Sequence, residues 1–152
     1  MHNLLSRLAR HDTIYLRLAL AAGFLTAVTD RFGLWGPPGT TNVAWGDWSH
    51  FLAYAAVLNP ELPASWIAPL GWLVTAAEIS LSLALLAGFH TRAAALLAGL
   101  LLFLFALGMT VGTGVKSALN ASVFSASAGA FLLARAQAYP WSLDGWRSAR
   151  SS

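Results

Sequence analysis

The sequence contains no cysteine, which excludes disulfide bonds, thiol redox chemistry and iron–sulfur ligation by this chain. Charged residues make up only 10% of the 152 residues, whereas a soluble domain typically has about 25%. So few charges cannot cover a water-facing surface. The nine Lys and Arg residues are scattered singly, which does not favour a nucleic-acid-binding protein. The four histidines show no metal-ligand spacing, so we expect neither a metal nor a haem held by this chain.

Hydrophobic residues make up 57% of the chain, and four apolar stretches approach the roughly 20 residues that a membrane-spanning helix needs. These stretches are residues 13–32, 69–89, 93–112 and 117–138. The last three are separated by very short turns, which favour antiparallel neighbours. We therefore predict an all-α membrane protein in which one domain, residues 1–152, forms an antiparallel bundle of four transmembrane helices.

The first apolar stretch has a basic start, as a cleaved signal peptide does. Apolar residues also precede Arg17, however, and they lengthen the stretch beyond a signal core. We expect a retained helix, with the Arg17 side chain extended to the lipid headgroups.

The distribution of Lys and Arg predicts the orientation, because cytoplasmic segments carry an excess of these residues. With the N-terminus inside, only Arg31 and Lys116 lie outside. The basic residues on or near the cytoplasmic side are then Arg7, Arg10, Arg17, Arg92, Arg135, Arg147 and Arg150. We predict that both termini are cytoplasmic and that residues 33–68 are extracytoplasmic.

The outer segment, residues 33–68, contains a helical stretch of about three turns at residues 45–58, too short to span a bilayer. A Gly-Pro-Pro-Gly run precedes it at residues 36–39, and Asn59-Pro60 ends it. Five of the seven tryptophans lie between residues 33 and 72. Because tryptophan favours the headgroup level, we expect a short interfacial helix on the outer face of the bundle.

Glu78 is the leading candidate for chemistry, because it falls near the middle of the second apolar stretch. Acidic side chains within membranes usually face the bundle interior and are functional. Gly71, Thr75 and Ser82 share its face at helical spacing. One hypothesis makes Glu78 a proton carrier; the alternative is a protonated side chain that only hydrogen-bonds a neighbouring helix.

Other polar residues gather at the outer face in this topology. His50, on the short helix, is a candidate proton relay because its unperturbed pKa is near 6.5, although a packed interfacial role is the alternative. Asp30 ends a stripe of small residues, and its alternative role is a boundary salt bridge to Arg31 or Lys116. The candidate substrate-binding residues are Asp30, Arg31, Trp48, Lys116 and Asn120. We expect an outward-facing pocket with tryptophans in its lining and Glu78 beneath.

The order and spacing of several short motifs resemble the DoxX family, including the DoxD-type small subunit of thiosulfate:quinone oxidoreductase. The similar segments are Arg17–Leu25 running into Asp30-Arg31-Phe32-Gly33, the acid Glu78, the turn Leu85–Ala95, the outer Trp48-Ser49-His50-Phe51 and the closing Ser142-Leu143-Asp144. Thr29-Asp30-Arg31 departs from the Gly and Lys that many members have near the end of the first helix.

The resemblance implies a four-helix bundle in the bacterial inner membrane and a role in quinone or sulfur redox chemistry. The implied function is a small subunit that binds quinone, or another amphipathic molecule, for an extracytoplasmic oxidoreductase. A redox partner subunit would supply electrons, Glu78 would exchange protons with His50 or Asp30 as relay, and the chain could form a homo-oligomer. The alternatives are a non-enzymatic scaffold or small-molecule carrier, and a bundle whose polar residues only join helices.

Overall fold

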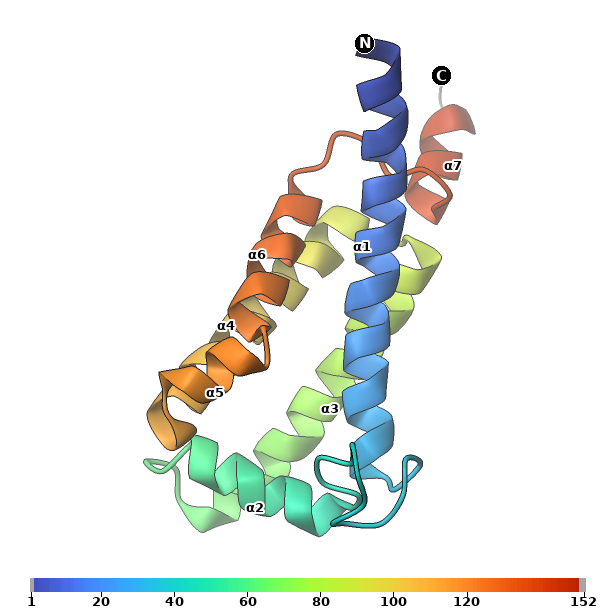
Figure 1. Cartoon of the computed structure of the whole chain (residues 1–152). Coiled ribbons are helices and arrows are strands. Elements are labelled where there is room, and N and C mark those ends of the chain that lie inside the picture. The colour runs from blue at the N-terminus through green and yellow to red at the C-terminus, as the bar shows by residue number, and fades with distance from the viewer. Residues whose placement is uncertain (1, 151–152) are drawn as a thin grey trace.

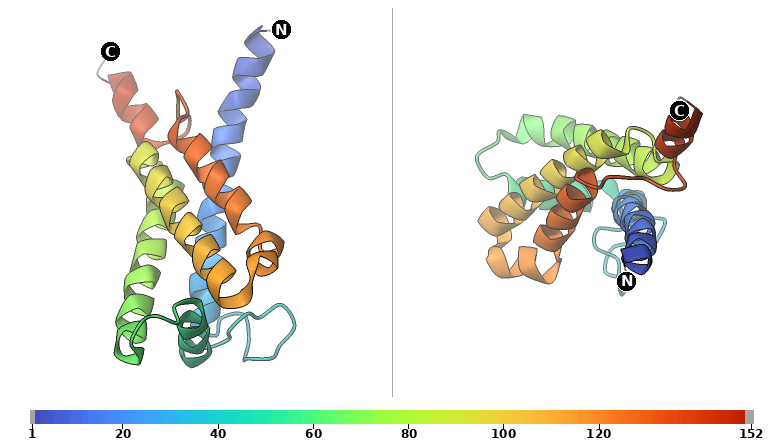
Figure 2. Two further views of the ribbon diagram at one scale, coloured as in Figure 1. Left: turned by 90° about the vertical axis from the view of Figure 1, so that its left-hand side faces the viewer. Right: turned by 90° about the horizontal axis from the view of Figure 1, so that it is seen from above.

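The computed structural model describes the backbone of residues 2–150 and the side chains of residues 11–147 and 150. This part of the chain is helical, without strands. In chain order the helices are α1 His2–Arg31, α2 Trp48–Leu58, α3 Ala64–Ala87, α4 Thr91–Thr113, α5 Val115–Asn120, α6 Val123–Ala134 and α7 Leu143–Arg150. Both ends of the described chain lie at one end of the molecule, and α2 runs crosswise at the opposite end (Figures 1 and 2).

Three helices are long and apolar enough to cross a membrane, which indicates a membrane protein. These candidate spans are His11–Arg31, Ala64–Ala87 and Thr91–Thr113. They correspond to the first three predicted stretches. α1 extends beyond its candidate span toward the N-terminus, and α3 begins at Ala64, earlier than the predicted residue 69, so that Pro69 lies inside the helix. Pro63, immediately before α3, is the proline that marks its start.

The fourth predicted stretch, residues 117–138, is not one continuous helix. It is divided into α5 and α6, because Ser122 adopts a left-handed backbone conformation with φ of 56°. α6 has 12 residues and is about 18 Å long, which is shorter than the roughly 30 Å hydrocarbon core. α6 nevertheless packs against α4 and returns the chain to the end where α1 begins (Figure 2).

A short helix is present within residues 33–68 as α2, where the sequence predicted helical residues 45–58. The Asp47 carboxylate caps it by accepting a hydrogen bond from the His50 backbone N–H at 2.8 Å. The end of α2 lies directly on Gly112 of α4, where an added Cβ would be 2.2 Å from the Val57 carbonyl oxygen. Glycine at this position therefore permits α2 to approach α4 closely.

The packed core occupies the half of the bundle near the termini. It consists of Leu20, Ala21, Phe24, Leu85, Ala94, Ala95, Ala98, Ala130, Leu133 and Ala134. The many alanines let the helices approach closely, which is typical of helix packing in membranes. A hydrogen bond from Ser127 Oγ to the Gly99 carbonyl oxygen, 2.8 Å long, joins α6 to α4 within this region.

Arg17 is buried at this end, so the expectation that it reaches the headgroups was wrong. Its side chain is 3% exposed and donates hydrogen bonds to the carbonyl oxygens of Leu85, Leu86, Pro140 and Trp141 at 2.9–3.2 Å. The last carbonyls of a helix have no partner within that helix. Arg17 therefore provides partners at the end of α3 and ties the segment after α6 to α1.

The Leu85–Ala95 turn and the Ser142-Leu143-Asp144 segment lie against each other. The Asp144 carboxylate accepts hydrogen bonds from the backbone N–H groups of His90, at 3.0 Å, and Thr91, at 2.6 Å. Its backbone N–H donates to the Gly88 carbonyl oxygen at 3.0 Å. Burial alone would raise the pKa of Asp144, but these hydrogen bonds outweigh burial and hold it below its usual range.

Candidate functional site

A cavity of about 610 Å³ lies in the half of the bundle opposite the termini. Its lining comes from α1, residues 44–45, α2, α3, α4 and the junction between α5 and α6. Apolar side chains such as Leu102, Phe105 and Met109 make up most of it. Because Arg31 and Glu78 provide its charged groups, we call it the Arg31–Glu78 cavity. An apolar pocket with a few polar groups is typical of a small-molecule site.

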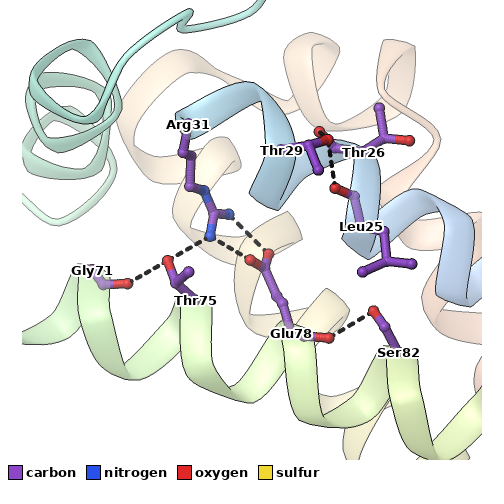
Figure 3. Close-up of polar contacts among 8 residues, drawn as sticks. All are labelled: Leu25, Thr26, Thr29, Arg31, Gly71, Thr75, Glu78 and Ser82. Carbon is purple, nitrogen blue, oxygen red and sulfur yellow. Dashed lines mark hydrogen bonds and ion pairs between the residues drawn. The ribbon is translucent and has the colours of Figure 1, made fainter. Parts of the chain in front are cut away.

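Glu78 and Arg31 form a buried ion pair between α3 and α1 (Figure 3). The guanidinium Nη2 donates to Glu78 Oε1 at 2.9 Å, and Nη1 donates to Glu78 Oε2. Arg31 is 2% exposed and Glu78 is 1% exposed. Two parallel hydrogen bonds are the geometry of a guanidinium with an ionised carboxylate. The prediction that Glu78 faces the bundle interior is confirmed, and its partner is the charged guanidinium of Arg31.

The helical spacing of α3 places Gly71, Thr75, Glu78 and Ser82 on one buried face, as predicted. Thr75 Oγ1 donates to the Gly71 carbonyl oxygen at 2.8 Å and accepts a hydrogen bond from Arg31 Nη1 at 2.8 Å. Ser82 Oγ donates to the Glu78 carbonyl oxygen at 2.7 Å (Figure 3). Thr75 thereby holds the guanidinium beside the carboxylate, whereas the Ser82 hydroxyl bonds to a carbonyl of its own helix.

Aromatic rings cover the guanidinium of Arg31. Its central carbon lies 4.0 Å from the centroid of the Phe51 ring and 5.3 Å from that of Trp45. Both distances are in the range of cation–π attraction. Arg31 therefore connects the end of α1 to α2 and to the segment before it.

Asp30 does not line the cavity but binds the backbone of the segment before α2. Its Oδ2 accepts hydrogen bonds from the backbone N–H groups of Ala44 and Trp45, both at 3.0 Å. The alternative role, a salt bridge with Arg31 or Lys116, is absent among the described residues, because Arg31 is bound to Glu78. Asp30 fixes the Trp45 segment beside the cavity, which sequence spacing alone did not indicate.

His50 lines the cavity and is also half exposed to the outside. Its Nδ1 is 2.9 Å and 3.0 Å from the two carboxylate oxygens of Asp47, which leaves Nε2 for another partner. The hydrogen bond from the His50 backbone, followed by those from the His50 ring and Ser49, lowers the pKa of Asp47 to about 2. Asp47 is therefore ionised at neutral pH and orients the imidazole.

The other predicted binding residues do not line the cavity. The Trp48 ring packs against Trp72, with centroids 4.3 Å apart, and stacks on Phe32 at 5.8 Å. It attaches α2 to the residue that follows α1 and to the first half of α3. Lys116 and Asn120 are exposed on α5, although Ala121, next to Asn120, is part of the lining. Of the seven predicted residues, the cavity therefore unites Glu78, Arg31 and His50.

Several lining residues were not singled out from the sequence. Phe51, Tyr54, Ala55 and Leu58 lie on one face of α2 at helical spacing, and all four line the cavity. That periodicity was the available signal. In contrast, nothing in the sequence indicated that Trp45 lies over Arg31, since its position depends on the contact of residues 44–45 with Asp30.

No family model, curated protein or solved structure matches this chain. Within the part of the chain that the structure describes, no group of three or more His, Asp or Glu side chains is placed to hold a metal ion.

Proposed function

We propose that this chain is a multi-pass membrane protein that binds an amphipathic small molecule, a quinone, in the Arg31–Glu78 cavity. The observation that carries the proposal is the cavity itself. It is large enough for the head and the first chain segment of such a molecule, and its lining combines apolar side chains with a few polar groups. The choice of quinone rests on the resemblance of the motifs to the DoxX family.

The positions of exposed aromatic residues support a membrane-spanning arrangement. One aromatic pair consists of Tyr15 in α1 and Phe32 immediately after it, and a second consists of Trp72 in α3 and Phe89 shortly after that helix. All four residues are between 40% and 75% exposed. The members of each pair are 17 positions apart, which is about 26 Å along a helix. Aromatic residues favour both interfaces of a bilayer whose hydrocarbon core is roughly 30 Å thick. These pairs are placed as two aromatic belts would be.

With the membrane placed between these two belts, α5 and α6 together form a fourth, broken crossing, and α2 is an interfacial helix at the outer surface. Irregular backbone inside a membrane is tolerated where it lies against protein or lines a cavity. The break at residues 121–122 meets this condition, because Ala121 and Val123 belong to the cavity lining. The bacterial inner membrane and cytoplasmic termini are the localisation we propose.

The proposed redox role assigns the electrons to a partner subunit, since this chain lacks cysteine. This chain would bind and orient the quinone, and a bound quinone takes up protons as it is reduced. His50 is the better placed proton carrier, because it lines the cavity and its Nε2 is not used by Asp47. Glu78 is held by Arg31, so a role in proton transfer would require this ion pair to open.

The proposal is tested by filling the cavity. Val74 lines it, whereas the adjacent Leu73 is 68% exposed on the outer surface of α3. We expect Val74→Trp to abolish co-purification of a lipophilic ligand, measured by mass spectrometry of the protein extracted in mild detergent. Leu73→Trp is the matched control and should retain the ligand.

The same preparation separates the alternatives. A quinone that is lost only from the Val74→Trp variant supports the proposal, and a co-purifying redox subunit supports the oxidoreductase role. A different lipophilic ligand without such a partner would favour the small-molecule carrier. Equal ligand content in both variants would exclude the Arg31–Glu78 cavity as the binding site.

A further inference from the structure

We infer that the Arg31–Glu78 cavity selects an uncharged ligand and excludes anionic amphiphiles such as fatty acids. This inference rests on the proposed function and specifies the chemical class of the ligand. It follows from the way the charges in the cavity are used. An isolated arginine in an apolar pocket would attract an anion, but the arginine here is already paired within the protein.

The hydrogen-bonding capacity of the guanidinium is largely used by the protein. Nη1 donates to Thr75 Oγ1 and Glu78 Oε2, and Nη2 donates to Glu78 Oε1. Nε is buried and has no hydrogen-bond partner among the described residues. The Phe51 ring lies over the guanidinium. A carboxylate that entered the cavity would meet a guanidinium whose charge Glu78 already balances. To form two parallel hydrogen bonds with Nη1 and Nη2 it would have to displace Glu78, and this would leave Glu78 buried and unpaired.

The rest of the lining provides no other fixed positive charge. Besides the Arg31–Glu78 pair, its titratable side chains are His50 and Tyr54. The chain has no Lys or Arg between Arg31 and Arg92, and Lys116 does not line the cavity. Outside, the ionised Asp47 is bound to His50. An anionic headgroup would therefore lose its hydration without gaining a counter-charge, which is costly.

Neutral polar groups do find partners in this cavity. His50 and Tyr54 on α2, and Asn59 immediately after it, all line the cavity and offer an imidazole, a hydroxyl and an amide. The Asn59 side-chain nitrogen donates to the Ala55 carbonyl oxygen at 2.9 Å, which leaves its oxygen as an acceptor. These groups match a ligand with carbonyl or hydroxyl groups on an apolar body.

The test compares two probes with the same alkyl chain, one uncharged and one anionic. Binding of a decyl-substituted benzoquinone and of decanoate is measured by isothermal titration to the purified full-length chain in nanodiscs. We expect the wild type to bind decanoate at least about tenfold more weakly than the quinone, because a buried unpaired charge is costly. Equal or tighter binding of decanoate would overturn the inference while leaving the cavity as the binding site.

Two variants test whether the ion pair causes this selectivity. Glu78→Gln leaves the Arg31 charge without its counter-ion, so decanoate should bind at least about tenfold more tightly than to the wild type. Arg31→Gln/Glu78→Gln removes both charges and should show no such gain. A gain in the double variant, or none in a folded Glu78→Gln protein, would contradict the inference. If Glu78→Gln does not fold, the wild-type comparison decides.

Failure of the proposed function gives a different pattern. If neither probe binds to the wild type, the proposed binding function fails at this site. The Glu78→Gln variant still tests the charge argument in that case, since only an unpaired arginine would give it an affinity for decanoate that the double variant lacks.

Discussion

Separating Arg31 from Glu78 by mutation should destabilise the protein more than removing both charges. In Glu78→Gln the amide has one acceptor oxygen for the two guanidinium nitrogens that Glu78 now binds, and its NH₂ group faces a donor. The variant also leaves a positive charge that is 2% exposed. Breaking a buried pair in this way costs about 3–5 kcal/mol. The Arg31→Gln variant should lose a similar amount.

The double variant Arg31→Gln/Glu78→Gln should be more stable than either single variant, because no buried charge is left unpaired. Replacing both members of a buried pair is often close to neutral, so we expect a coupling free energy of at least about 2 kcal/mol. Thermal and denaturant unfolding of all four proteins in one detergent provides the double-mutant cycle. Glu61→Gln is the control, since this carboxylate is exposed on the segment before α3.

The reasoning would be refuted if Glu78→Gln unfolded at the same temperature as Glu61→Gln. It would also be refuted if the two single effects simply added in the double variant. Either result would mean that Arg31 and Glu78 do not stabilise each other, and Arg31 would then be free to attract an anionic ligand.

Three further predictions concern the rest of the molecule. Gly88→Ala should strongly lower the unfolding temperature, because φ is +64° and the new Cβ would lie 2.2 Å from the Cβ of Ser142, whereas Gly23→Ala meets no atom within 4 Å and should be tolerated. Asp144→Ala should cost about 1 kcal/mol of unfolding free energy at neutral pH, as expected for loss of a helix cap. The pKa of Asp144 is lower in the folded protein than its usual value near 3.9. The contribution of Asp144 to the free energy of unfolding is therefore complete above this usual value and is lost as the pH falls through the folded pKa. Asp144→Ala should lack this part of the acid destabilisation that the wild type shows. Finally, a cysteine replacing the exposed Ser49 should react with an impermeant thiol reagent in intact cells, whereas one at Ser6 should react only after lysis; the reverse pattern would overturn the proposed orientation.

Local sequence patterns were sufficient to predict most of the helices. The three long apolar stretches form α1, α3 and α4, and the segment between Gly-Pro-Pro-Gly and Asn59-Pro60 forms α2. Such elements are predictable because apolar content, proline and glycine act on the backbone within a few residues of themselves. The break at residues 121–122 was missed, since Asn120-Ala121-Ser122 is polar enough to permit a turn but does not require one.

For the site, the sequence indicated single residues but not their partners. The cost of a carboxylate in an apolar helix was enough to identify Glu78 and to predict that it faces the interior. The sequence did not show that Arg31, 47 residues away, is its counter-ion, and the salt bridge considered for Arg31 was with Asp30 next to it. In the structure Asp30 accepts backbone hydrogen bonds and Arg31 reaches α3 instead.

The sequence by itself therefore determined the helical class, the positions of three long apolar helices and the presence of a buried acid, because each depends on the composition or periodicity of a short stretch. The tertiary structure alone decided which charges pair, that Arg17 binds four carbonyl groups, and that His50, Glu78 and Arg31 share one cavity while Trp48, Lys116 and Asn120 lie outside it. These features depend on the direction in which each helix turns its side chains toward the others. That direction is set by close packing at positions such as Gly88 and Gly112, where neighbouring segments touch backbone to backbone.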